Sequence, residues 1–357
     1  MKKEADCIIV GQGIAGSNLA LHLLERGLKV EIVDDCWNGA ACLVAAGVLN
    51  PITGKRLAKS WRSDVALPCA KKFYASLQKK LGAKFFCERK ILQLCKSPEE
   101  AELWHGRKED PAYCGFLSQY NPPSTVKNLN DNFGSFFINF AAWVEAPRAM
   151  EALKKYFLSL GVLKLEKFDY SRLKIGADFV EYQNLRAKKI VFCEGWKAVE
   201  NPYFNWLPYR PARGEILGVK IEGGVSEHII HREKWLMRCG QNLYRNGSTW
   251  DRINFRNNAP TLEARAELER ALPQILGHGN FEIFEQQSGV RPCTATTRPH
   301  LGAPPKFKNL YSFNGFGSKG YALTPYFANH FSQYLLGEIP LDKEADLARH
   351  IRKFYKG

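Results

Sequence analysis

The first 34 residues contain apolar segments separated by a glycine-rich turn, a pattern typical of one strand-helix-strand unit. Residues 6–10 form a short apolar run, which predicts a strand buried in a parallel sheet. A helix is predicted next, because its apolar residues recur on one face: Leu19, Ala20, Leu23 and Leu24. Gly27 ends this helix, and residues 29–33 predict a second strand.

The turn between the first strand and the helix has the spacing Gly-x-Gly-x-x-Gly. Gly11 permits a tight turn, Gly13 lets the backbone approach a pyrophosphate, and Gly16 allows close packing of the helix. The second strand ends at Asp34, where a carboxylate can accept hydrogen bonds from a ribose hydroxyl. Since a helix N-terminus favours anions, the unit predicts a dinucleotide site. Three neighbouring residues are expected to contact the same ligand: Ile14, Ala15 and Asp35.

A run of small residues follows, from 40 to 56, with the sequence AACLVAAGVLNPITGKR. Small side chains allow the backbone to approach a ligand closely. The residues expected to line the cofactor site here are Ala41, Cys42, Ala45, Ala46, Gly47 and Val48.

The composition is that of a globular protein with a substantial core. The chain has 357 residues, of which 45% are hydrophobic and 12% aromatic, a length suited to two domains. The most apolar window, residues 136–144, is half the length needed to span a bilayer, and the first residues lack a secretory signal pattern. We therefore expect a soluble, cytoplasmic protein with no membrane partner.

The ten cysteines are expected to be reduced, because several lie in predicted core strands, such as Cys7 and Cys193. No CxxC pair occurs, and the spacing of His228 and His231 points the two side chains to opposite faces of a strand. The sequence therefore predicts no metal site.

The net charge is +15, more than one bound dinucleotide requires. Either an acidic partner such as RNA or a solvated basic surface accounts for it. The surface interpretation is favoured, because Lys and Arg are spread along the whole chain.

Several segments resemble the D-amino-acid oxidase (DAO) family of FAD enzymes. Ala45-Ala46-Gly47-Val48 resembles the Ala-Ala-Gly segment of that family, although the family carries Thr or Ser where this chain has Ala40, Ala41 and Cys42. The segment RAKKIVFCEGWKA resembles the strand that runs to a glycine beside the cofactor, here Gly195, with Glu194 in place of a small residue. Residues 288–302 and 309–337 resemble the Arg-Pro turn, the Pro-x-hydrophobic-Gly turn and the glycine-rich corner between a strand and a helix.

The resemblance implies an α/β fold of two domains. One is a Rossmann-like FAD-binding domain of glutathione-reductase or D-amino-acid-oxidase type, from residues 1–80, 145–210 and 288–357. The other is a mainly antiparallel β substrate domain with helices, from residues 81–144 and 211–287. FAD is expected to bind non-covalently, with no bond to Cys293. The corner residues expected to contact it are Gly315, Phe316, Gly317, Ser318, Lys319 and Gly320.

The resemblance also implies oxidation of the C–N bond of an amino acid or related amine, by hydride transfer to flavin N5 and then to O2 or another electron acceptor. Arg291 is the expected partner of a substrate carboxylate, and Lys319 is expected to place positive charge near the flavin. Two weaker groups of substrate-cavity candidates remain. The first group can equally be a helix start with a solvated face: Lys55, Arg56 and Trp61. For the second group, Tyr244 and Trp250, a place in the sheet core is favoured over contact with the substrate.

Two alternative functions stay open. The glycine-rich corner also resembles the FAD domain of the bifunctional tRNA wobble-uridine modification enzyme, for which tRNA would be the partner. A flavin-bound protein used for binding or redox sensing is the other alternative.

Overall fold

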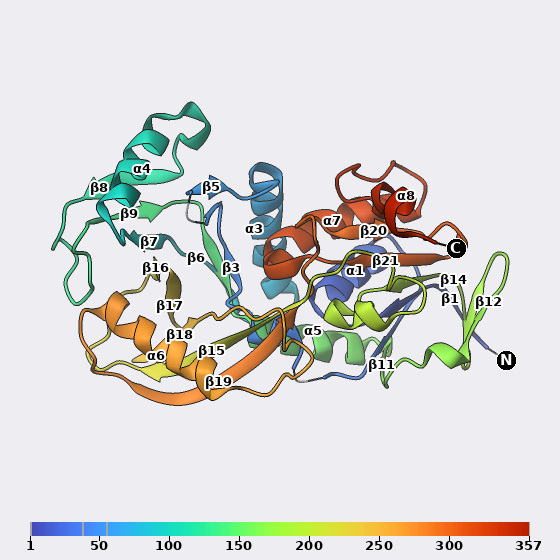
Figure 1. Ribbon diagram of the computed structural model, residues 1–357. Coiled ribbons are helices and arrows are strands. Elements are labelled where there is room, and N and C mark those ends of the chain that lie inside the picture. The colour runs from blue at the N-terminus through green and yellow to red at the C-terminus, as the bar shows by residue number, and fades with distance from the viewer. Residues whose placement is uncertain (1, 38, 55, 357) are drawn as a thin grey trace.

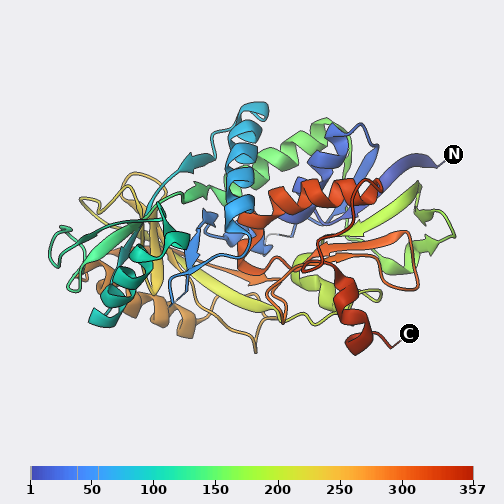
Figure 2. The same cartoon turned by 90° about the horizontal axis from the view of Figure 1, so that it is seen from above.

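Two eight-stranded sheets occupy opposite halves of the molecule (Figures 1 and 2). The structure is a computed structural model, and it describes residues 2–37, 39–54 and 56–356. Both chain termini lie in the half that holds the first sheet (Figure 1).

The first sheet is mainly parallel and is built around β1. Its strands run in the order β11 (Leu163–Leu165), β2 (Val30–Asp34), β1 (Lys3–Val10), β14 (Leu185–Phe192), β13 (Val180–Tyr182) and β12 (Leu173–Ile175). β21 (Leu310–Asn314) also pairs with β14, in parallel, and β20 (His300–Gly302) pairs with β21. Segments from the start, the middle and the end of the chain therefore meet in one sheet.

Helices cover one face of this sheet, and alternate residues of β1 divide between two cores. Cys7 and Ile9 face the helix side, while Ile8 and Val10 face the other core, so the strand is apolar on both faces. The helices are α1 (Ile14–Glu25), α2 (Ala41–Val44), α3 (Ser63–Lys80), α5 (Ala146–Ser159) and α7 (Gly320–Leu335). α7 packs against both α1 and α3, as Figure 2 shows.

The second sheet forms the other half. Its strand order is β19 (Glu282–Arg291), β15 (Ala212–Lys220), β18 (Leu243–Gly247), β17 (Lys234–Arg238), β16 (Ile229–Arg232), β7 (Ile91–Leu94), β9 (Ser135–Ile138) and β8 (Leu117–Asn121). All neighbours pair antiparallel except β16 and β7. Leu217 and Leu236 pack on Leu268 and Leu272 of α6 (Leu262–Leu276), which covers one face of the sheet (Figure 1).

Short elements connect and cap the two halves. β3 (Val48–Leu49), β10 (Ala142–Val144) and β6 (Phe86–Glu88) form a small sheet, and β4 (Ile52–Thr53) pairs with β5 (Ala58–Lys59). The remaining helices are α4 (Pro98–Glu109), α8 (Ile351–Phe354) and the 3-10 helices η1 (Pro111–Tyr113), η2 (Tyr170–Arg172), η3 (Gly195–Glu200), η4 (Gly317–Lys319) and η5 (Leu347–His350).

The predicted fold class is confirmed: a Rossmann-like sheet with helices stands beside a mainly antiparallel sheet. The domain limits stay a prediction, and the proposed limit at residue 288 falls inside β19. In the described part of the chain, no helix has the length and apolar character that crossing a membrane requires.

A buried histidine begins β20 of the first sheet and does not line the cavity described below. His300 is fully buried between the rings of Tyr209 and His350, whose centroids each lie 4.9 Å from its own. Neither ring nitrogen has a hydrogen-bond partner within the described residues. Burial is the main cause that lowers the pKa of His300 well below its usual range, so the native protein holds this imidazole neutral.

We predict that His300 makes the protein acid-sensitive. Because its pKa is depressed only in the folded state, the unfolded chain binds the extra proton, and the free energy of unfolding falls as the pH drops below about 6.5. Between pH 7.5 and pH 5.5 this one group costs about 1 kcal/mol. The His300→Phe variant should lose that part of the pH dependence in chemical denaturation at saturating FAD.

The control is His105→Gln, at an exposed position of α4. This change should leave the difference in unfolding free energy between the two pH values as it is in the unmodified protein. An unchanged pH dependence in His300→Phe would refute the assignment.

Candidate cofactor and substrate site

A cavity of about 640 Å³ lies between the two sheets. Its walls come from the glycine turn after β1, the small-residue segment, the corner before α7 and the face of the second sheet that α6 does not cover. All the predicted cofactor-binding residues line it except Gly16 and Gly315, and so do Arg291 and Trp61.

Gly11 and Gly16 shape the turn itself. Gly11 has φ +102°, and a Cβ atom there would lie 2.5 Å from the carbonyl oxygen of Cys193. A Cβ atom on Gly16 would lie 1.9 Å from the carbonyl oxygen of Gly11. Helix α1 thus starts in backbone contact with the end of β1, and Gly16 serves that contact from outside the cavity.

Gly13 faces the cavity and leaves room there. It caps the N-terminus of α1, and an added Cβ atom would meet only the Cys42 Sγ atom, at 3.7 Å. No acidic residue occurs in the first turn of α1. Free backbone N–H groups and open space at a helix N-terminus fit the phosphates of a dinucleotide.

Asp34 joins the end of β2 to the glycine turn. Its Oδ2 atom accepts a hydrogen bond from the Gln12 backbone N–H at 2.6 Å, and Oδ1 accepts from the Cys36 N–H at 2.5 Å. Asp35, which also lines the cavity, pairs with Lys197 at 2.9 Å. The carboxylate of Asp34 is therefore fixed at the position where a ribose hydroxyl is expected.

The small-residue segment is held from both sides. The Tyr321 hydroxyl of α7 donates to the Cys42 carbonyl oxygen at 2.7 Å, and the Trp143 indole N–H of β10 donates to the Ala46 carbonyl oxygen at 3.0 Å. Gly47 packs so tightly that an added Cβ atom would lie 1.8 Å from the Val144 carbonyl oxygen. The backbone of this segment thus forms a rigid wall of the cavity.

Glu194 places a carboxyl group in the cavity wall, which the sequence indicated only as a departure from a small residue. Tyr170 donates its hydroxyl to Oε1, and Asn201 Nδ2 donates to Oε2 at 2.7 Å. Burial outweighs these bonds and raises the pKa of Glu194 to about 7. Tyr170 lines the cavity as well, and nothing in the sequence pattern marked it.

The corner before α7 brings a cation to the cavity. Helix α7 begins at Gly320, and Lys319 is its N-cap. Burial lowers the pKa of Lys319, and the nearby charge of Arg298 adds to the effect. Gly315 lies behind this corner, where an added Cβ atom would meet Thr294 Cγ2 at 2.7 Å, so its part is in packing.

Arg291 ends β19 at the cavity, and only neutral groups hold its guanidinium. Its Nη2 donates to Ser248 Oγ at 2.5 Å, and its Nη1 donates to the carbonyl oxygens of Thr249 and Arg213 at 3.3 and 3.4 Å. The guanidinium also stacks on the Trp250 ring, 4.8 Å from its centroid. Within residues 2–37, 39–54 and 56–356, no carboxylate pairs with it.

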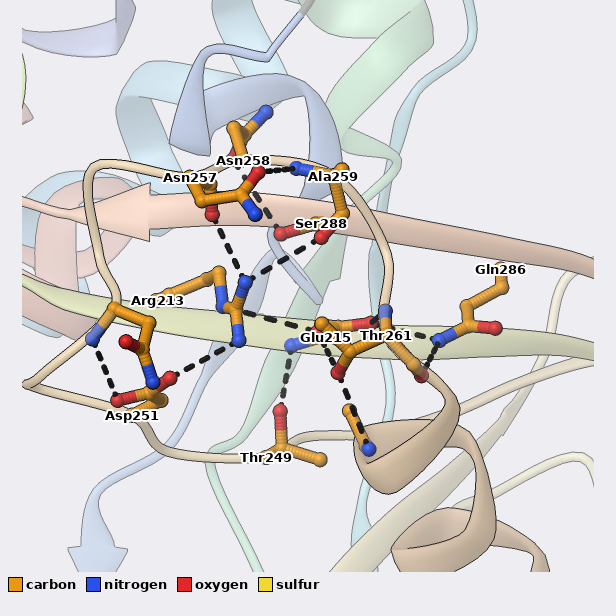
Figure 3. Close-up of polar contacts among 12 residues, drawn as sticks. Arg213, Glu215, Thr249, Asp251, Asn257, Asn258, Ala259, Thr261, Gln286 and Ser288 are labelled. Carbon is orange, nitrogen blue, oxygen red and sulfur yellow. Dashed lines mark hydrogen bonds and ion pairs between the residues drawn. The ribbon is translucent and has the colours of Figure 1, made fainter.

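A buried polar network on the α6 side of the second sheet fixes the loop that carries these partners (Figure 3). Arg213 of β15 donates to Asp251 Oδ2 at 3.0 Å and to the Asn257 carbonyl oxygen at 2.9 Å. Its Nε atom lies 3.8 Å from Oε1 of Glu215. One arginine thus ties both ends of the loop 249–259 to the sheet.

Glu215 completes the network although its side chain is fully buried. It accepts hydrogen bonds from the Thr261 N–H and hydroxyl, at 3.0 and 2.9 Å, and from Gln286 Nε2 at 2.7 Å (Figure 3). Its backbone N–H donates to Thr249 Oγ1 at 2.9 Å. Because every member is bonded, the network is rigid, and it holds Ser248 and Thr249 in place for Arg291.

Three of the predicted substrate-cavity residues lie elsewhere. Tyr244 is fully buried on the α6 side, because strand alternation turns it away from the cavity, and its hydroxyl accepts from the Val225 N–H at 2.9 Å. Trp250 is 49% exposed and reaches the site only through the stack on Arg291. Arg56 is exposed and outside the cavity, and Lys55 is outside the described residues.

The sequence analysis missed several cavity residues in or next to the strands of the second sheet, among them the polar and aromatic side chains of His231, Trp235 and Ser248. Ile229 and His231 are two residues apart on β16 and face the cavity together, so the alternation of a strand was a usable signal. The spacing of His231 from His228 had been considered only for a metal site. In the described residues, no three His, Cys, Asp or Glu side chains group as metal ligands.

The fold and the cavity together define a dinucleotide-binding enzyme whose second sheet covers the ligand site. Residues 6–334 match the family model described as FAD dependent oxidoreductase, and the chain belongs to this family, DAO. FAD is accordingly its cofactor, and the predicted enzyme class, an FAD-dependent oxidoreductase, is confirmed.

Similar proteins cover almost the whole chain at low identity. The uncharacterized oxidoreductase YurR of Bacillus subtilis is 24% identical over 93% of this chain and 95% of its own length. The tRNA 5-methylaminomethyl-2-thiouridine biosynthesis bifunctional protein MnmC of Azoarcus is 22% identical over 96% of this chain, which spans 59% of that protein.

Two solved structures share the fold. Iminodiacetate oxidase from Chelativorans has a TM-score of 0.80 and 21% identity, covering 95% of this chain and 98% of its own. Glycine oxidase from Geobacillus kaustophilus has a TM-score of 0.81 and 19% identity, covering 98% and 99%.

We predict that Gly13→Val folds but binds FAD poorly. The backbone at Gly13 has φ −62°, which valine adopts, and the nearest atom to the new Cβ is 3.7 Å away, so the fold tolerates the side chain. The side chain would stand where the phosphates approach, and affinity should fall by about 1 to 3 kcal/mol or be lost. Flavin absorbance after gel filtration measures it, with circular dichroism as the test of folding.

The matched control is Gly106→Val in α4, where an added Cβ atom meets nothing within 4 Å. This variant should retain FAD. Full FAD binding by Gly13→Val would show that the phosphates do not approach at Gly13.

Proposed function

We propose that the protein oxidises the C–N bond of an amino acid or related amine that carries a carboxylate. The observation that carries the proposal is Arg291: a cavity-lining guanidinium whose partners are all neutral oxygens or an aromatic ring. A guanidinium in that state binds a carboxylate in a two-pronged pair. The names of two structural neighbours, iminodiacetate oxidase and glycine oxidase, agree with such a substrate.

The residues divide the work between cofactor and substrate. When bound, FAD supplies a two-electron acceptor for a hydride from the carbon next to nitrogen. The N-terminus of α1 at Gly13 holds the phosphates, Asp34 accepts from a ribose hydroxyl, and Lys319 stabilises negative charge near the flavin. In this proposal the phosphates and the flavin would each lie near a group of positive polarity.

Arg291 orients the substrate. Ser248, Thr249 and the Trp250 ring fix the plane of its guanidinium, so a bound carboxylate takes one orientation. An amine held in this way needs alignment of its α-hydrogen rather than a dedicated base. The network of Arg213 and Glu215 behind the sheet supports that alignment indirectly.

A second candidate is oxidation of a tRNA side chain at the same C–N bond. MnmC of Azoarcus, whose printed function is biosynthesis of a modified tRNA uridine, aligns with 96% of this chain, and the net charge of +15 suits an RNA partner. The two candidates share the chemistry and differ in the molecule that carries the amine.

One experiment separates them. Loss of the 450 nm flavin absorbance under anaerobic conditions reports substrate oxidation independently of the electron acceptor. We expect one or more of a panel of D- and L-amino acids, glycine, sarcosine and iminodiacetate to bleach the flavin, and unfractionated tRNA not to do so. Bleaching by tRNA alone supports the second candidate, and bleaching by no member of either set contradicts both.

We predict that Arg291→Ala keeps FAD but loses about 2 to 5 kcal/mol of transition-state stabilisation for the substrate that bleaches best, measured as kcat/KM. The loss follows from removing the charge that pairs with the carboxylate. Arg291→Lys should recover only part of it, because an ammonium restores the charge without the planar geometry.

The control for this prediction is the decarboxylated analogue of the same substrate, a simple amine. It should react poorly with both proteins and show little further loss in Arg291→Ala. Equal losses for the amino acid and the amine would mean that Arg291 serves the flavin or the fold.

A further inference from the structure

His231 lies on the cavity face of the second sheet, in a row of cross-strand partners. Trp235 of β17 pairs with it on one side, and Gln93 of β7 pairs with it on the other. Both His231 and Trp235 line the cavity. The part of the sheet that covers the substrate therefore includes an imidazole that no step above uses.

The contacts of Gln93 fix which nitrogen of His231 carries the proton. Gln93 Nε2 donates to Glu100 Oε1 at 3.1 Å and to the Leu94 carbonyl oxygen at 3.3 Å, so the amide oxygen faces the imidazole. That oxygen lies 2.7 Å from His231 Nδ1. An amide oxygen only accepts hydrogen bonds, so Nδ1 must be the protonated nitrogen of His231.

The tautomer leaves Nε2 as an unprotonated acceptor. Burial lowers the pKa of His231 to about 4, against the opposing charge of Glu233, so the ring is neutral at pH 7. The Nε2 atom makes no hydrogen bond to any residue within 2–37, 39–54 and 56–356. Because His231 lines the cavity, a neutral imidazole with one free lone pair there can recognise an N–H or O–H donor.

Strand spacing sets the distance between this acceptor and the carboxylate site. Arg291 is anchored at Ser248, directly after β18, and His231 lies two strands away on β16, with Trp235 of β17 between them. The Arg291 guanidinium also lies against Gly214 of β15, the strand next to β18. Neighbouring strands are about 4.8 Å apart, so the imidazole and the guanidinium are separated by about 10 to 15 Å. A cation, an aromatic surface and a neutral acceptor therefore follow one another along the wall.

We propose that His231 Nε2 selects substrates that carry an N–H or O–H donor at the end remote from the carboxylate. The preferred class is an amino acid with an extended side chain that ends in an amide, urea, amino or hydroxyl group, with its methylene groups on Trp235. This proposal rests on the proposed function, because it takes the carboxylate to be bound at Arg291.

The test compares matched substrates in the FAD-loaded protein. Glutamine and citrulline carry a terminal NH2 group, while methionine and norleucine have similar length and no donor at that end. In anaerobic flavin reduction, the donor substrates should exceed the others in efficiency by about tenfold, the effect of one hydrogen bond to a site that is otherwise left unpaired. Both enantiomers are assayed.

His231→Leu removes the acceptor and should abolish the tenfold preference, because the efficiency of flavin reduction should fall only for the substrates with a terminal donor. The matched variant Gln93→Met leaves the imidazole in place but removes the group that fixes its tautomer, and it should reduce the preference less. His231→Gln restores an acceptor oxygen and should recover part of it. FAD content and thermal unfolding confirm that each variant is folded.

A second readout needs no turnover. Titration with a non-reacting enantiomer, followed by the change in flavin absorbance, gives a dissociation constant. The His231→Leu substitution should weaken the binding of glutamine and leave the binding of methionine unchanged. The proposal would be overturned if the unmodified protein bound and oxidised glutamine and methionine equally well. Equal losses of binding for both amino acids in His231→Leu would also overturn it. Absence of reduction by every amine is a different result, which contradicts the proposed function itself.

Discussion

The contact between Gly16 and Gly11 is the constraint on which the cofactor site depends. Only where two glycines meet can the first turn of α1 touch the backbone at the end of β1. This contact aims the helix N-terminus at the cavity and leaves the surface of Gly13 open. Asp34 then closes the turn by bonding to the Gln12 N–H. The anion site is thus made of backbone, and glycine packing together with the Asp34 carboxylate fixes its position.

On the side of the cavity formed by the second sheet, a charged side chain, Arg291, provides the proposed binding group instead of the backbone. Arg291 needs a water-poor surface to bind a carboxylate strongly, yet a buried cation is costly unless other groups solvate it. Carbonyl oxygens, one hydroxyl and an aromatic ring do so here without neutralising it. The loop that provides them is anchored on the other face of the sheet by Arg213 and Glu215.

The sequence predicted the parts of the site that are contiguous in the chain. Residues 6–34 supply a strand, a turn, a helix and an acid whose geometry is local, and Gly11, Gly13 and Asp34 line the cavity. For Tyr244 the sequence left two positions open, the cavity and the sheet core, because the face of a strand residue follows from pairing register, which a single segment does not define; the structure places it in the core. His231 was missed because its tautomer depends on a contact with Gln93, which is 138 residues away in the sequence.

Glu194 gives the cofactor site a proton equilibrium of its own. A carboxyl group with a pKa of about 7, set in the wall of the cavity proposed to hold the dinucleotide, exchanges protons near neutral pH. An anion bound beside Glu194 favours the protonated form, and by reciprocity the ionised form disfavours the anion. The cavity wall therefore carries less negative charge in mildly acidic solution than in alkaline solution.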